Sequence, residues 1–267
     1  MYRILDNLKD LGLELELPFE IFSATCTPKA EEQAEEKEPV DHSAYVFNKD
    51  FECPICRAKF VFSVVRSSKL RMSHMNELRP SYHDIEPLYY DVRMCVACGY
   101  AALKDRFDRV SDKQKEALLA NIRTNYLNFM PASIPDTIDG KLAAELFKYA
   151  LLSAFVKKTT TGEKAMLLIK LSWIYQDLED EENYNLYGKY AYEFLTEAYT
   201  TESFPILGMG QGAATYILAR YATHFKDYSA ALKFLSDVII DRGLPTRLRD
   251  LARDMKDEIL ELRKEDE

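Results

Sequence analysis

The second half of the chain repeats a pattern in which apolar residues recur three or four positions apart. This pattern is present in six segments, at 143–155, 167–178, 184–198, 214–225, 228–239 and 244–262. Each segment has the 3.6-residue period of a helix with one buried face. Helix-breaking residues separate several of them, among them Gly162, Pro205 and Gly243. The pattern predicts six amphipathic helices arranged as three hairpins.

The segment "ATYILARYATHFKDYSAALKFLSDVIID", residues 214–241, follows the rhythm of a tetratricopeptide repeat. It has Leu218 and Ala219 in its first helix, and Ala231 and Leu235 in its second. Small alanines at these positions allow two paired helices to pack closely. The preceding hairpin has a degenerate version of the same spacing. A solenoid of helical hairpins is therefore expected.

The helical region is predicted to cover residues 111–264. It begins at "SDKQKEALLANI", where Ser111 followed three residues later by Gln114 has the spacing of a capping box. The concave face of such a solenoid offers a surface for a protein or peptide. We therefore expect a protein or peptide partner on the helical domain.

The residues before the helices have a different pattern. In residues 50–110, "KFVFSVVRSSKLRM" and "LYYDVRMC" are rich in β-branched and aromatic residues and predict strands. Residues 28–49 include the acidic run "PKAEEQAEEKEPVD" and are predicted to be a linker, because like charges repel and nothing in that run can be buried. Residues 1–27 form a separate segment of helix- and strand-like pattern.

Two matched cysteine pairs lie in the strand-rich region: Cys53 and Cys56 in "CPICRAKF", and Cys95 and Cys98 in "MCVACGYAAL". Each Cys-x-x-Cys turn presents two sulfurs on one side, and two such turns complete the tetrahedral shell of Zn²⁺. Gly99 permits a positive φ after the second turn. The sequence therefore predicts a structural zinc site formed by these four cysteines. The expected fold class is mainly α: a tetratricopeptide-like solenoid preceded by a small β-rich, zinc-ribbon-like module.

Two enzymatic alternatives use the same cysteines, a thiol-disulfide oxidoreductase and a zinc-dependent enzyme. A redox dithiol usually has one such motif at a helix start within an α/β pattern, whereas here two motifs lie beside strands. A catalytic zinc keeps an open position for water. With four sulfurs present, neither His74 nor His83 is needed as a ligand. Cys26 has no partner and is expected to be a free thiol, and no catalytic residues are predicted.

Basic residues gather around the first cysteine pair: Arg57, Lys59, Arg66, Lys69, Arg71 and Arg79. They form a possible patch for an anion, an acidic peptide or a nucleic acid. The favoured interpretation is simpler, since four thiolates and one Zn²⁺ carry a net charge of −2 that nearby cations offset. The net charge of the whole chain, −9, argues against broad attraction to nucleic acid or anionic membranes.

The expected compartment is the cytoplasm. The first 22 residues place acidic side chains every few positions, unlike the apolar core of a signal peptide. The most apolar internal run, "YALLSAFV" at 149–156, is too short to span a bilayer. Structural disulfides are rare in a reducing compartment, which also favours metal binding by the cysteines.

The motifs "CPICRAKF", "ELRPSYHDIEPLYYDVRMCVACGYAAL" and "FPILGMGQGAATYILARYATHFKDYSAALKFLSDVI" occur in this order. Together they resemble an uncharacterised bacterial family, domain of unknown function 2225, over residues 45–260. The chain departs from the usual motif at Val96, where members carry proline. The resemblance implies a zinc-ribbon-like module followed by tetratricopeptide-like helices, and it implies no reaction.

Overall fold

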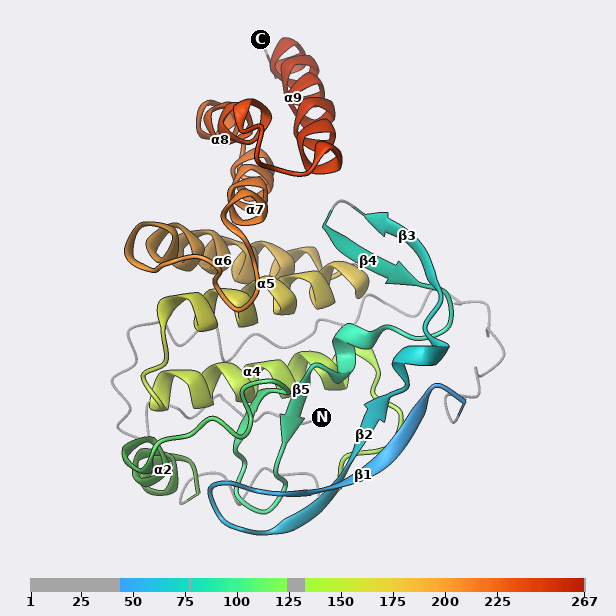
Figure 1. The fold of residues 1–267 in the computed structure, drawn as a ribbon, viewed down its shortest axis with the longest axis vertical. Helices are drawn as coiled ribbons and strands as arrows, with labels where there is room; N and C mark the ends of the chain where they lie inside the picture. The colour runs from blue at the N-terminus through green and yellow to red at the C-terminus, as the bar shows by residue number, and fades with distance from the viewer. Residues whose placement is uncertain (1–43, 77, 124–132, 267) are drawn as a thin grey trace. The chain divides into compact units, whose positions relative to one another are not determined.

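The computed structural model describes residues 44–76, 78–123 and 133–266 (Figure 1). Residues 1–27, Cys26 included, and residues 28–43 of the expected acidic linker lie outside this part. The chain divides into two compact units. The first unit comprises Met1–Asn76, Pro80–Thr159 and Leu167–Tyr187, and the second comprises Glu77–Arg79, Thr160–Met166 and Gly188–Glu267. This division differs from the expected boundary at residue 110, because the cysteine pairs share a unit with helical residues.

Short antiparallel strand pairs form the first part of the described chain. They are β1 (Val46–Glu52) with β2 (Lys59–Val65), β3 (Met72–Asn76) with β4 (Arg79–Tyr82), and β5 (Val92–Met94) with β6 (Ala101–Leu103). Two 3₁₀ turns, η3 (Ser67–Lys69) and η4 (Pro87–Tyr90), connect them. The β1–β2 hairpin has the longest register, from Val46 opposite Val65 to Glu52 opposite Lys59.

Two expectations for this region need correction. The linker expected to reach residue 49 ends earlier, because Val46–Lys49 already pair with β2. The segment "LYYD" was expected to be strand but largely forms η4. Pro87 occupies the start of this 3₁₀ turn, and the Glu86 carboxylate accepts a hydrogen bond from the Leu88 backbone N–H. Both features favour a helical turn over an extended strand.

Helices make up most of the remaining described chain. They are α2 (Asp112–Leu118), continued by the π-helical η5 (Leu119–Arg123), then α4 (Gly140–Val156), α5 (Thr161–Asp177), α6 (Glu181–Thr201), α7 (Gln211–His224), α8 (Tyr228–Ile240) and α9 (Thr246–Asp266). The six helices expected after residue 140 are all present. The predicted capping box also forms at the start of α2, with Ser111 and Gln114 bonding reciprocally. The mainly helical fold with small strand pairs is confirmed.

The helix α4 forms the centre of the first unit. Nearly all of its residues are buried, including Leu146, Phe147 and Leu151, at 1% exposure or less. Its neighbours include α2, η4, β5 and β6 (Figure 1). The helix is therefore covered on most of its circumference, the polar Lys148 and Ser153 included, whereas the sequence pattern predicted one buried face.

The second unit has its own core between α7, α8 and α9. Ala219 and Ala222 of α7 face Ala231 and Leu235 of α8, and all four are fully buried. Ile259 of α9 is also fully buried in this cluster. The small side chains let the α7 and α8 backbones approach closely. No helix in the described part of the chain is long and apolar enough to cross a membrane.

Candidate metal centre

The first cysteine pair lies in the turn that joins β1 to β2. The Cys53 backbone N–H donates to the Ala58 carbonyl (3.0 Å), and the Arg57 N–H donates to the Cys53 carbonyl (3.0 Å). The Ile55 N–H also points at the Cys53 sulfur, 3.4 Å away. Arg57 adopts a φ of +63°, a left-handed conformation that usually favours glycine.

The second pair repeats this turn between β5 and β6. The Cys95 N–H donates to the Tyr100 carbonyl (2.9 Å), and the Gly99 N–H donates to the Cys95 carbonyl (2.8 Å). Gly99 has a φ of +79°, so it matches Arg57 in position and conformation. Because both turns have the same hydrogen bonds, each presents its two sulfurs in the same way.

The four sulfurs converge on one point. The Sγ atoms of Cys53 and Cys98 are 3.6 Å apart, and those of Cys56 and Cys95 are 3.7 Å apart. All four ligand atoms lie within 4.8 Å of one another. A disulfide needs about 2.05 Å between sulfurs, so none of these pairs is bonded. A zinc ion with bonds of about 2.3 Å to four sulfurs requires edges of about 3.8 Å in its tetrahedron. The cluster therefore has the dimensions of a tetrahedral metal site.

The thiols of the cluster are closely coupled. Hydrogen bonds from Cys53 and then Cys98 lower the pKa of Cys95 to about 4. The pKa of Cys98 is raised, first by its hydrogen bond to Cys53 and then by that to Cys95, since the bonded proton is held between sulfurs. Without a cation, the lowered pKa of Cys95 favours its thiolate, and the raised pKa values of Cys53 and Cys98 favour their protonated thiols. A divalent cation at the centre would displace those protons.

Aromatic side chains pack beside the two turns. Phe60 of β2 contacts the ring of Phe107, with 5.9 Å between centroids, and Phe107 contacts Tyr100 at 4.9 Å. The Tyr100 hydroxyl donates to the Phe107 carbonyl (2.9 Å). These contacts connect the β1–β2 hairpin with the segment that follows β6.

The second turn is also anchored to α4. The backbone N–H of Ala101, the first residue of β6, donates to the Oγ of Ser153 over 3.2 Å. Both residues are fully buried. The metal centre therefore shares a packed core with α4.

The structure separates the basic cluster into residues with different roles. Arg57 pairs with Glu52 at 3.1 Å on the surface, and the Arg66 side chain donates to the Val46 carbonyl. Lys59, Lys69 and Arg71 are exposed, whereas Arg79 belongs to the second unit. Only Arg57 and Lys59 are close in sequence to the cysteine turns.

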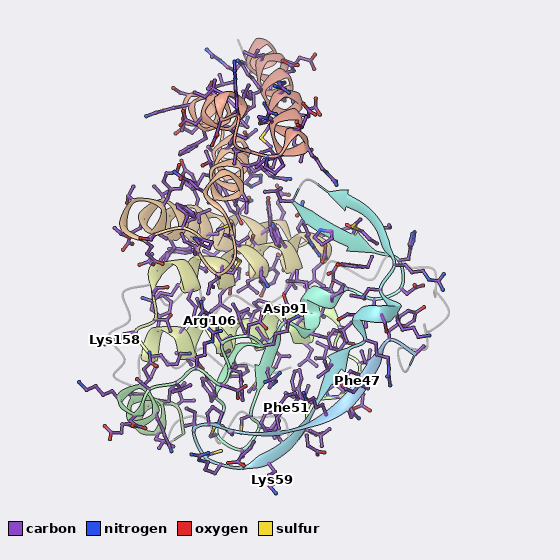
Figure 2. The ribbon with its side chains drawn as sticks, viewed as in Figure 1. Phe47, Phe51, Lys59, Asp91, Arg106 and Lys158 are labelled. Carbon is purple, nitrogen blue, oxygen red and sulfur yellow. The ribbon has the colours of Figure 1, made fainter. Side chains whose placement is uncertain are left out.

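Sequence reasoning missed a partly buried ion cluster around Asp91, just before β5. Asp91 binds Lys104 (2.6 Å) and Lys170 of α5 (2.5 Å), and its side chain is only 16% exposed (Figure 2). Burial raises the pKa of Asp91, but Lys170 and Lys104 outweigh this effect, so the net pKa is lowered. Lys104 follows β6 at once, but no signal in the sequence identifies Lys170 as a partner of Asp91, because 79 residues separate the two.

The histidines do not enlarge the cysteine cluster as far as the structure describes them. His83 is exposed, and the metal-ligating group found among the described residues consists of the four cysteines alone. The side chain of His74 lies outside the described part. All four predicted cysteines are thus brought together, without a fifth described ligand.

Comparisons with known proteins give matches without a described function. A family model described as "Uncharacterized protein conserved in bacteria (DUF2225)" matches residues 46–259, which include both cysteine pairs and most of the helices. A protein of Borreliella burgdorferi described as "Uncharacterized protein" is 28% identical over 170 residues. That match covers 56% of this chain and 60% of the relative. No solved structure gives a significant match.

Proposed function

The chain belongs to this bacterial family, and we propose that it is a structural zinc protein whose helical region binds a protein or peptide partner. The observation that carries the zinc assignment is the convergence of four cysteine sulfurs within 4.8 Å of one another, with two of their separations close to the edge length of a zinc tetrahedron. In this account Cys53, Cys56, Cys95 and Cys98 are the ligands. The metal would act as a cross-link between two hairpins, and no residue is assigned a catalytic role.

The donor set supports zinc over other common metals. Thiolates are soft ligands that favour Zn²⁺, Cu(I) or iron–sulfur clusters, whereas Mg²⁺ and Ca²⁺ take oxygen. Isolated Cys-x-x-Cys turns at two hairpin ends are typical of zinc ribbons. Three of the sulfurs belong to buried residues, and Cys56 is half-buried, which suits a closed site.

A structural role follows from the small size of the strand pairs that carry the ligands. β5 and β6 share three residue pairs, and an isolated two-stranded hairpin is marginal in water. When bound, zinc would hold the β1–β2 turn against the β5–β6 turn. The chain's own contribution is to preform both turns, through the matched hydrogen bonds to the Cys53 and Cys95 carbonyls.

Metal analysis with thiol titration tests this part of the proposal. Protein purified without added metal or chelator should contain about one zinc per chain, with four thiols protected until a chelator is added. Metal-free protein with reactive thiols, or with a reversible disulfide, would contradict the proposal and favour the thiol-disulfide alternative. Zinc with an exchangeable water, detected by binding of an anion to Co²⁺-substituted protein, would favour a zinc enzyme.

The helical part of the proposal rests on the second unit. Its α7–α8 hairpin packs through Ala219, Ala222 and Ala231, and close helical pairs of this kind form the binding surfaces of repeat proteins. Ile240, at the end of α8, is an apolar side chain with 74% exposure. Such surface is available to a partner without disturbing the core.

Site-specific crosslinking tests the partner. A photoreactive amino acid replaces Ile240 in one variant and the exposed Lys59 in a control. The proposal expects one reproducible protein adduct from position 240 and none from position 59. Adding excess protein without the photoreactive group should suppress the adduct. Equal crosslinking at both positions, or none at Ile240 and at further exposed α8 positions such as Lys233, would contradict a partner on this helix.

A further inference from the structure

A cavity of about 230 Å³ lies in the first unit, and none of the four cysteines lines it. Residues of β2 form one side, and residues from η4 to the end of β6 form the other. Its lining includes four apolar or aromatic side chains and two cations: Phe62, Leu70, Pro87, Tyr90, Arg93 and Lys104. No carboxylate belongs to the lining. The cavity is therefore lined mainly by apolar side chains, and the charged side chains in its lining are both positive.

Arg93 is a mostly buried cation whose ion pair with a carboxylate is long. Its side chain is 13% exposed, and its guanidinium lies over the ring of Phe51 with 3.6 Å to the centroid. Phe51 is labelled in Figure 2. Its ion pair with Asp108 spans 3.8 Å, beyond hydrogen-bond distance, and Asp108 is 74% exposed. Asp105 is a second acidic neighbour that interacts electrostatically with Arg93. Because burying a charge without a close partner is costly, an anion beside Arg93 would be stabilised.

Lys104 adds a second positive charge. It binds Asp91 at 2.6 Å, but the same carboxylate also binds Lys170 at 2.5 Å. Two ammonium groups thus share one carboxylate, which leaves one unit of positive charge. The Lys104 side chain is also half-exposed, so its ammonium retains donors for a further acceptor.

The outer edge of β2 supplies backbone donors on the same cavity. The Arg66 N–H bonds the Tyr45 carbonyl, and the Cys53 N–H bonds the Ala58 carbonyl. In an antiparallel ladder, hydrogen-bonded and non-hydrogen-bonded pairs alternate. Counting from Arg66 therefore places Ser63 and Val65 at non-bonded positions, with their N–H and C=O groups directed away from β1. Both residues line the cavity.

From this combination we propose that the cavity binds a small organic anion, a carboxylate or phosphate group on a compact apolar body. The anionic group lies between Arg93 and Lys104 and accepts from the free edge of β2. The apolar body packs on Phe62, Leu70 and Pro87. Drug-sized ligands occupy roughly 300–1,000 Å³, so the volume suits a smaller molecule. The lining of this site includes none of the four cysteines and no residue of the helical partner surface.

The test uses full-length protein and four probes: phenylacetate, its neutral isostere phenylacetamide, benzyl phosphate and inorganic phosphate. Amide chemical shifts follow each titration. Saturable shifts at Ser63, Val65 and Arg93 are expected with phenylacetate, with benzyl phosphate or with both, and their relative affinities distinguish a carboxylate from a phosphate site. The affinity for phenylacetamide should be at least about tenfold lower than that for phenylacetate, because the amide lacks the negative charge.

Two outcomes would overturn the proposal. One is the absence of saturable shifts at these amides with either organic anion. The other is equal binding of phenylacetate and phenylacetamide, which would mean that the cations contribute nothing. Inorganic phosphate binding as tightly as benzyl phosphate would contradict the apolar part of the site.

Variants locate the site. Arg93→Gln and Lys104→Gln should each weaken the bound anion about tenfold, and Lys59→Gln, an exposed cation outside the lining, should leave the affinity unchanged. Lys104→Gln keeps the test decisive if Arg93→Gln fails to fold, because Lys104 is half-exposed. Equal effects of Lys104→Gln and Lys59→Gln would contradict the proposal.

Discussion

Replacing Cys98 by serine removes one sulfur from the cluster with the smallest possible change in shape. Cys98 is 3% exposed, and its Sγ lies 3.6 Å from that of Cys53. A serine hydroxyl keeps a polar atom near this position but is a hard, weakly acidic donor. If the cluster holds zinc, three thiolates remain and the fourth position opens.

The expected loss of zinc affinity follows from the four-fold arrangement. Structural zinc sites contribute roughly 10–16 kcal/mol at neutral pH in small peptides. Shared equally among four thiolates, that is about 3–4 kcal/mol per ligand. Cys98→Ser should therefore bind zinc about 100- to 1,000-fold more weakly. Competition with a chromophoric chelator measures this change.

The structural consequence should be confined to the first unit. The β5–β6 turn has three residue pairs and is held to α4 by the Ala101–Ser153 hydrogen bond. The loss of up to about 4 kcal/mol is a large part of the 5–15 kcal/mol that stabilises a typical domain. Hydrogen exchange should therefore accelerate in β5, β6 and α4. The helices α7, α8 and α9 should keep their protection, because their core is their own.

Cys26→Ser is the matched control, since it makes the same chemical change at the cysteine that lacks a partner motif. It should leave the zinc affinity unchanged. A Cys98→Ser affinity within about threefold of the parent, or an equal loss in Cys26→Ser, would refute the four-thiolate reasoning. Equal loss of protection in α8 would refute the independence of the second unit.

Three further changes test the surrounding contacts. Arg57→Gly should stabilise the first turn by roughly 1 kcal/mol, and Gly99→Ala should destabilise the second by a similar amount, because both positions have positive φ. Urea unfolding measures both changes. If the two variants changed the free energy of unfolding in the same direction, the turns would not be matched. Ser153→Ala should cost about 1–3 kcal/mol by leaving the buried Ala101 N–H without its acceptor, and an unchanged midpoint would argue against that anchor. The lowered pKa of Asp91 means that its charge stabilises the fold above its ordinary pKa of 3.8 and that this contribution is lost as pH falls through the lower folded-state value. The stability difference between the parent and Asp91→Asn should therefore shrink on acidification, and a difference that grows would contradict the lysine pairing.

Local sequence signals predicted the site better than its surroundings. The spacing within each Cys-x-x-Cys pair, together with a preference for positive φ at Gly99, was enough to predict two similar turns. Arg57 occupies the position equivalent to Gly99, and it adopts the same conformation although it is not a glycine. Turn geometry depends on a few neighbouring residues, so it can be read from them.

Features that depend on distant residues were not predictable. The ion cluster of Asp91 joins residues from three parts of the chain. The burial of most α4 residues arises because several elements cover the helix, whereas its own periodicity shows only one apolar face. The cavity between β2 and Arg93 likewise depends on tertiary packing. The extent of η4 was missed because the aromatic run outweighed the turn signal of Glu86 and Pro87.

X-ray absorption at the zinc edge of the purified full-length protein tests the central claim most directly. The account predicts one shell of four sulfurs at about 2.3 Å, reduced to three sulfurs when Cys98 is replaced by serine. A shell containing nitrogen or oxygen in the parent protein, or a metal other than zinc, would contradict a closed structural site formed by Cys53, Cys56, Cys95 and Cys98.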